Sequence, residues 1–138
     1  MKLVPRHEFM TSLLTELLEP GESLKFPFYG AIQKIGMQNH IFYAYFGLTH
    51  NTMLITVVNN WNLSKGEWTT RVPLDIKSVV AKKSIFLNQL VIQIEFHEGN
   101  DVWIRAYKKV VFGDIGNQEL HIEKFIEAIS SHATKFSE

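Results

Sequence analysis

The sequence predicts a mainly β (α+β) fold: about seven antiparallel strands, a C-terminal capping helix and an extra N-terminal amphipathic helix. Three observations predict it. Residues 41–58 form two apolar runs that fold back on each other at residues 47–52, residues 90–108 alternate with a period of two, and residues 117–136 carry apolar side chains at helical spacing. We therefore expect a sheet built from hairpins with a helix packed across it.

The size and composition of the chain favour one soluble domain. Its 138 residues are enough for a core of its own, and the absence of cysteine excludes disulfides, thiolate metal sites and a cysteine nucleophile. Residues 1–9 contain a proline and charges where a secretory signal needs a continuous apolar stretch. No later run reaches the roughly 20 apolar residues of a membrane span. We expect a single cytoplasmic domain over residues 1–138.

The charge balance argues against polyanionic partners. Fourteen basic and fourteen acidic residues cancel, whereas most nucleic-acid binders and anionic-membrane binders carry a net positive domain. The basic clusters are Lys82-Lys83 and Lys108-Lys109, and charged pairs of this kind commonly protect the edges of sheets. We expect no nucleic-acid partner and no strong membrane or phosphoinositide binding.

Residues 7–18 are predicted to form the N-terminal amphipathic helix, which Pro20-Gly21 ends. Its apolar face is wide for so short a helix and consists of Phe9, Met10, Leu13, Leu14, Leu17 and Leu18. Such a face has to be covered. It packs either on the sheet of its own chain or on a second copy or partner, and in the second case Phe9, Leu13 and Leu17 are candidate partner contacts.

Residues 22–108 are expected to hold all the strands. The first strand is predicted at residues 22–33, where Pro27 places it at a sheet edge or in a bulge because proline cannot donate to a ladder. Residues 59–66 are predicted to be a polar loop that presents Trp61. Two further short strands follow, with an interruption at Pro73.

Residues 90–108 are predicted to form a hairpin with one apolar face. Matching the two apolar rows requires paired residue numbers with an even sum, and we expect Ile94 opposite Ile104 and Phe96 opposite Val102. A three-residue loop at residues 98–100 satisfies this pairing.

The C-terminal helix is predicted over residues 117–136, with Asn117 as its N-cap. One apolar stripe runs along it, made of Ile122, Phe125, Ile126, Ile129, Ala133 and Phe136. A single stripe of this kind is typical of a helix that packs with one face across an open sheet.

Three short segments resemble those of bacterial pleckstrin-homology-like (PH-like) domains: LEPGESL at residues 18–24, GLTHNTMLI at 47–55 and VPLDIKSV at 72–79. The middle segment has one extra residue, and Met53 stands where the family often has arginine. The resemblance implies a PH-like barrel with the terminal helix across one open corner, and a role in binding or assembly. Phosphoinositide-binding relatives carry several basic residues around the first hairpin, whereas this chain has Lys25 and Lys34 there.

No phosphate-binding glycine loop, nucleophile elbow or zinc-protease motif occurs, and the six histidines lack metal-ligand spacing. We therefore expect no cofactor, no metal and no enzymatic activity. Trp61 and Trp103 join the candidate partner contacts, because tryptophan supplies large amphipathic contact area. The leading hypothesis is a non-enzymatic PH-like module that binds a protein partner or itself as a homo-oligomer. The alternative is a carrier or sensor of a lipid or other apolar ligand, and a hydrolytic enzyme comes third.

Overall fold

The structure is a computed structural model that describes residues 4–35, 41–83, 88–99, 101–110 and 115–133. Its elements in chain order are α1 (His7–Thr15), β1 (Lys25–Ile35), β2 (Phe42–Leu48), β3 (Thr52–Asn59), β4 (Asn62–Pro73), β5 (Ile76–Lys83), β6 (Gln89–Phe96), β7 (Val102–Tyr107) and α2 (Gln118–Ser131). The seven strands form one antiparallel sheet in the order β4-β3-β2-β1-β7-β6-β5. The predicted fold class is confirmed.

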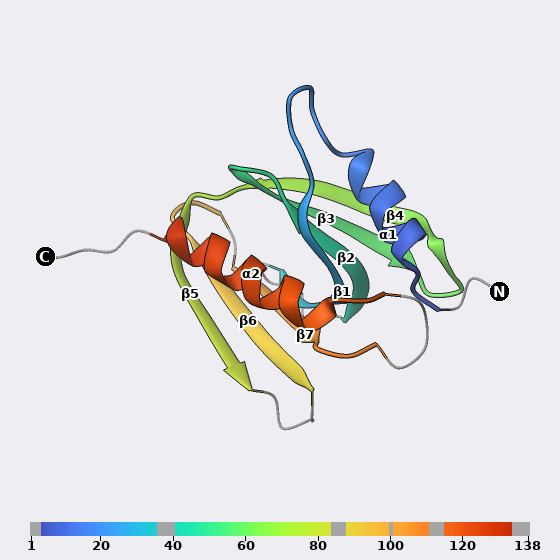
Figure 1. Cartoon of the computed structure of the whole chain (residues 1–138). Coiled ribbons are helices and arrows are strands. Elements are labelled where there is room, and N and C mark those ends of the chain that lie inside the picture. Colours follow the sequence, from blue (N-terminus) through green and yellow to red (C-terminus); the bar gives the residue numbers. More distant parts are fainter. Residues whose placement is uncertain (1–3, 36–40, 84–87, 100, 111–114, 134–138) are drawn as a thin grey trace, which may run out of the picture.

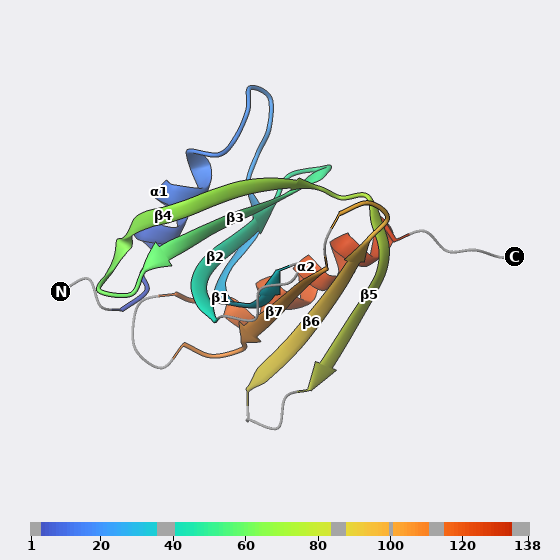
Figure 2. The ribbon, with the colours of Figure 1, turned by 180° about the vertical axis from the view of Figure 1, so that it is seen from behind.

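The sheet is strongly bent, and β1 joins its two halves. β2, β3 and β4 lie on one side of β1, and β7, β6 and β5 lie on the other. Figures 1 and 2 show the two halves diverging, with α2 along the open side between them. At the corner between β4 and β5, Leu74 N donates to the Asn51 carbonyl at 3.0 Å and His97 N donates to the Asp75 carbonyl at 3.0 Å. These bonds hold the two halves together at one end.

The inner face of the sheet forms a closed apolar core with α2. The Phe28 ring stacks on Phe46 at 5.0 Å and meets Phe125 of α2 edge-on at 4.8 Å between centroids. Ile122 and Ile129 of α2 are buried in the same core. The predicted apolar stripe of the terminal helix therefore faces the sheet.

The outer face of β1–β4 is covered by α1. Met10 and Leu14 are fully buried there, in one cluster with Tyr45 and Leu54. β2 and β3 are thus covered on both faces, which explains why residues 41–58 are apolar almost throughout instead of alternating. The first of the two predicted packings for α1 is the one observed.

Both helices are shorter than predicted. α1 ends at Thr15, because the N–H groups of Leu17 and Leu18 bond to carbonyls three residues back in a tight turn before Pro20. α2 begins at Gln118 and ends at Ser131, while residues 134–136 lie outside the described residues.

Asn117 is the N-cap residue of α2, but its side chain makes no capping hydrogen bond. It adopts a left-handed conformation with φ of 59°, which asparagine tolerates better than most residues. Its backbone carbonyl accepts the first helical bond from His121 N at 2.9 Å.

Pro27 lies in a bulge of a central strand, so the bulge alternative is confirmed and the edge alternative is wrong. β1 starts at Lys25 rather than at residue 22 and pairs with β2 and β7. Its register with β2 shifts between Lys25 and Phe28, and Phe26 takes a left-handed φ of 52°. The bulge frees the Pro27 carbonyl, which accepts a bond from His121 Nδ1 at 2.8 Å.

The polar stretch at residues 59–66 is a tight hairpin and not the predicted loop. Asn59 pairs with Asn62, so Asn60 and Trp61 alone connect β3 to β4. The polar side chains stabilise the turn locally, since Asn59 Oδ1 accepts from Trp61 N at 2.8 Å and Asn62 Oδ1 accepts from Ser64 N at 3.0 Å.

The β6–β7 register differs by two residues from the prediction. Ile94 pairs with Val102 and Ile92 with Ile104. Both apolar rows share a face as expected, but Phe96 pairs with Ile76 of β5, and the connection to β7 is longer than three residues.

The LEPGESL segment forms a turn fastened to β4. Gly21 has φ of 85°, Glu19 N donates to Glu22 Oε1 at 2.9 Å, and Glu22 N donates to the Glu19 carbonyl at 3.0 Å. The Arg71 guanidinium of β4 donates to the two Glu22 carboxylate oxygens at 2.7 and 2.8 Å. It also donates to the Leu17 carbonyl at 2.9 Å. The turn therefore depends on Gly21 for its positive φ and on Glu22 for its bonds to Arg71.

Candidate functional site: a tyrosine-lined cleft

Four tyrosines gather on the outer face of the sheet. Tyr43 and Tyr45 are two residues apart on β2 and so share a face, and Tyr29 of β1 pairs directly with Tyr45. Tyr107 comes from β7, on the other side of β1. The Tyr29 ring lies 6.0 Å from Tyr43, 5.8 Å from Tyr45 and 5.8 Å from Tyr107, centroid to centroid.

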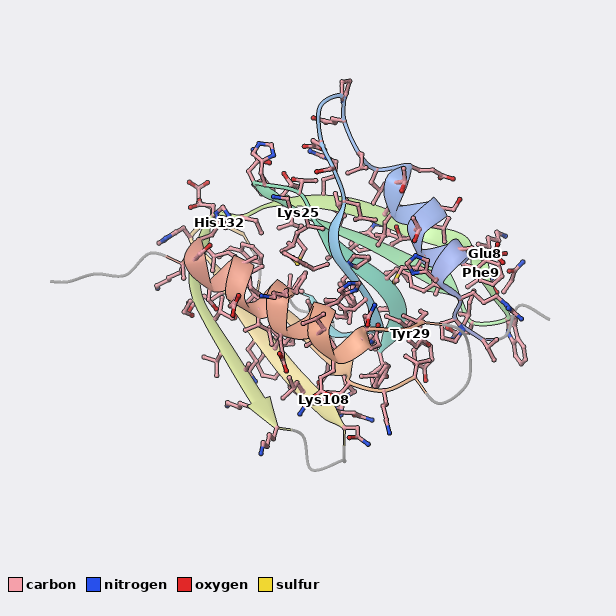
Figure 3. The ribbon with its side chains drawn as sticks, viewed as in Figure 1. Glu8, Phe9, Lys25, Tyr29, Lys108 and His132 are labelled. Atoms are coloured by element: carbon pink, nitrogen blue, oxygen red, sulfur yellow. The ribbon has the colours of Figure 1, made fainter. Side chains whose placement is uncertain are left out.

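Gln118 at the start of α2 positions two of these tyrosines. The ladder between β1 and β7 pairs Gly30 with Ala106 at its last step. Beyond it, Gln118 Nε2 donates to the carbonyls of Tyr29 and Tyr107, each at 2.7 Å. Figure 3 shows Tyr29 near the beginning of α2. The amide thus bridges the two strands and fixes the separation of the Tyr29 and Tyr107 backbones.

An open cleft of about 540 Å³ lies over the tyrosines. We call it the tyrosine cleft. It is lined by Val4, Pro5, Tyr29, Tyr43, Asn60, Leu63, Gln89, Tyr107, Lys109 and Val110. Its volume falls in the range of about 300–1,000 Å³ that is usual for ligand sites.

The Tyr29 and Tyr107 hydroxyls of the cleft stay protonated near neutral pH. Burial raises the pKa of Tyr29, and the neighbouring tyrosines raise it further. Burial also raises the pKa of Tyr107. Among the described lining residues there is no histidine, carboxylate, serine or threonine. The described residues of the cleft therefore offer hydroxyl and amide groups for hydrogen bonding beside aromatic rings.

Tyr45 links β2 to Leu63 of β4, a residue that lines the cleft. Its hydroxyl donates to the Leu63 carbonyl at 2.8 Å. Burial raises the pKa of the Tyr45 hydroxyl, and the nearby Arg6 backbone partly offsets this rise. The neighbouring Pro5 is buried and lines the cleft.

The sequence-predicted contact residues do not converge on one site. Phe9, Leu13 and Leu17 of the α1 region are half-buried against the outer core of their own chain. Trp61 is 81% exposed and follows Asn60, a residue of the cleft. Trp103 is half-buried, with Lys34 Nζ 4.8 Å from the centre of its ring.

The two lysines of the first strand do not meet either. Lys25 and Lys34 lie at opposite ends of β1. Lys25 lines a separate hollow of about 440 Å³ with His50 and His132, beside the end of α2 (Figure 3). The Lys34 ammonium group lies over the Trp103 ring in a cation–π contact. They cannot hold the same phosphate group.

Within the described part of the chain, no group of three or more histidines or carboxylates is placed to hold a metal ion. No helix among the described residues is long and apolar enough to span a membrane.

Sequence reasoning missed Tyr29, Tyr43, Tyr107 and Lys109 as site residues. The spacing of Tyr43 and Tyr45 did signal one shared face of a strand. The contribution of Tyr107 depends on β1 pairing with β7, and local sequence carries no signal for that pairing.

No family model matches the sequence, and no curated protein matches it. Solved structures resemble it. The C-terminal domain of an unknown protein from Leishmania infantum superposes with a TM-score of 0.58 at 11% identity, covering 88% of this chain and 95% of that one. The hSac2 domain from human phosphoinositide phosphatase Sac2 superposes with a TM-score of 0.56 at 10% identity, covering 93% of this chain and 82% of that one. At these identities the likeness establishes a shared fold.

Proposed function

We propose that this chain is a non-enzymatic PH-like binding module that holds a peptide segment of a protein partner in the tyrosine cleft. The observation that carries the proposal is the cleft itself: an open site of about 540 Å³ with tyrosine rings and amide donors on its walls. Rings with a polar tip give contact area at low entropic cost and are common in protein recognition sites.

Two features support a peptide over an apolar ligand carried inside the barrel. The interior is packed with the Phe28, Phe46 and Phe125 rings, whereas the cleft opens to solvent. Its lining also mixes aromatic rings with Asn60, Gln89 and Lys109, which suits the amide groups of a peptide better than a hydrocarbon chain.

Self-association through the α1 face receives less support. Met10 and Leu14 are fully buried against the outer core. A second copy would therefore have to contact the rim of α1 or the exposed Trp61. A homo-oligomer in which one chain supplies the peptide to the cleft of another is still compatible with the proposal.

Selection from a random twelve-residue peptide library on the immobilised full chain tests the proposal. We expect one peptide family to be enriched by the wild type, and its members to bind Tyr43→Ala about tenfold more weakly, the loss typical of a contact hot spot. Trp68→Ala is the matched control, since Trp68 is 46% exposed but pairs with Val57 of the inner core and so lies on the opposite face.

Failure to enrich any family, or equal binding by Tyr43→Ala, contradicts the proposal. Light scattering of the wild type and of Tyr43→Ala reports self-association through the cleft. Sedimentation with phosphatidylcholine and phosphatidylserine vesicles tests the lipid alternative, and binding that Tyr43→Ala leaves unchanged would favour it.

A further inference from the structure

The spacing of the cleft tyrosines matches an extended left-handed peptide. Neighbouring ring centroids are 6.0 Å apart between Tyr43 and Tyr29 and 5.8 Å apart between Tyr29 and Tyr107. A polyproline II helix rises about 3.1 Å per residue, so two of its residues cover about 6 Å. These rings come from three adjacent strands, which sets them across the sheet.

The chain itself places a proline at this site. Val4 and Pro5 both line the cleft, and Pro5 is buried. The following residue, Arg6, is extended, with φ of −134° and ψ of 146°. The cleft that the tyrosines line thus also contains a proline from a short N-terminal segment of the same chain.

The polar groups of the cleft include hydrogen-bond donors, and a polyproline II peptide has acceptors without partners. Its carbonyls make no internal hydrogen bonds. Tyr29 and Tyr107 keep their hydroxyl protons because burial raises their pKa values. Gln89 Oε1 accepts from Arg105 at 2.8 Å, and the N–H groups of the same amide can donate to a ligand. Aromatic faces with interspersed donors are the usual surface for proline-rich segments.

Lys109 sets the charge preference of the site. It is the charged residue among the described residues that line the cleft, and it is exposed. A carboxylate near the prolines would gain from it, mainly in association rate and at low salt.

We propose that the ligand of the tyrosine cleft is an extended proline-containing peptide with an acidic residue beside the prolines. This inference rests on the proposed function and names its partner class. Pro5, which lines the same cleft, is the proline that the chain itself places beside the tyrosines.

Fluorescence anisotropy with the full chain and labelled synthetic peptides tests the inference. The first probe has eight prolines followed by two glutamates, the second replaces the glutamates by lysines, and the third replaces the prolines by alternating glycine and serine. We expect saturable binding of the first probe, at least about tenfold tighter than of the third. Equal binding of the first and third probes overturns the proline assignment.

Variants locate the probe and test its charge preference. Tyr43→Ala should weaken the first probe about tenfold, while Tyr43→Phe keeps the ring and should stay within about threefold. Lys109→Glu should reverse the preference between the glutamate and lysine probes. Trp68→Ala should change neither. Circular dichroism confirms that each variant is folded, and equal affinity in Tyr43→Ala and the wild type overturns the inference.

The outcomes separate this inference from the proposed function. A peptide family without proline that still depends on Tyr43 removes the proline assignment and leaves the binding module in place. Absence of any peptide that depends on Tyr43 removes both. If Trp68→Ala weakens binding of the first probe, the ligand lies on the opposite face of the sheet. That result overturns both the inference and the proposed function.

Discussion

The Gln118 side chain pairs with both backbone polar groups of Tyr29. Gln118 Oε1 accepts from Tyr29 N at 2.9 Å, and Gln118 Nε2 donates to the Tyr29 carbonyl at 2.7 Å. A side-chain amide thus imitates a neighbouring strand at the point where β7 has left β1. The same amide reaches the Tyr107 carbonyl at 2.7 Å and ties the terminal helix to two strands of the tyrosine cleft.

Gln118→Met should lower the free energy of unfolding by about 2–4 kcal/mol, because it keeps the side-chain size and leaves buried backbone groups without partners. Urea unfolding followed by circular dichroism measures the change. Leu120→Ala is the control, since Leu120 is 51% exposed and should change stability by less than about 1 kcal/mol. Equal effects of the two substitutions would refute this role of Gln118.

Glu22→Gln should remove a pH-dependent part of the stability. The bidentate bond from Arg71 lowers the pKa of Glu22 to about 2 from its ordinary 4.5. A carboxylate with a lowered folded-state pKa stabilises the fold above its unfolded pKa, and this stability is lost as the pH falls from about 4.5 towards 2.

Urea midpoints of the wild type and Glu22→Gln at pH values from 7 to 2 check this prediction. We expect the two curves to be well separated at neutral pH and to approach each other in the acid range. Glu19→Gln is the matched control, because the Glu19 side chain is 66% exposed and lies 3.5 Å from Arg71. A constant separation at every pH would contradict the assignment of the low pKa to Glu22.

Thr56→Val should stabilise the protein by about 1 kcal/mol. The Thr56 hydroxyl is fully buried, and within the described part of the chain it has no hydrogen-bond partner. Valine has nearly the same shape and removes the cost of the unpaired hydroxyl. Thermal unfolding measures the shift, with Thr69→Val as the control on the directly opposed, exposed position of β4. A lower melting temperature for Thr56→Val would mean that the hydroxyl is paired in solution.

Gly30→Ala should destabilise the protein by about 1–3 kcal/mol, because an added Cβ would lie 2.5 Å from the Arg105 carbonyl oxygen of β7. Gly116→Ala is the comparison, since an added Cβ there meets nothing within 4 Å. Chemical unfolding of both variants checks the prediction. Tolerance of alanine at position 30 would show that β1 and β7 can move apart.

Short-range patterns predicted most of the fold. The alternation of residues 90–108 and the helical spacing of Ile122, Phe125 and Ile129 identified the strands and the capping helix, because each pattern reports which side chains face the core. The hairpin register was missed by two residues, since the competing partner of Phe96 is Ile76 of β5, which lies outside the hairpin. Local alternation fixes the face of a strand and leaves its offset open.

The candidate site was much harder to predict. Its aromatic wall needs β1 between β2 and β7. The backbones of Tyr29 and Tyr107 are held by Gln118, a residue that a helical pattern classes as an ordinary first-turn residue. The predicted contacts Phe9, Leu13 and Leu17 had been selected for their apolar character, and that character serves the outer core of the same chain. Trp61 and Trp103 are predicted contacts because tryptophan is the largest aromatic residue, and this criterion does not identify the tyrosines.

The position of β1 between β2 and β7 also constrains how the chain is made. β1 is synthesised before the other six strands of the sheet, and one of its two neighbours, β7, is synthesised after them. Until β7 is available, one edge of β1 has no ladder partner and the two halves of the sheet are not joined. Assembly of the sheet therefore waits until all of its strands have been translated.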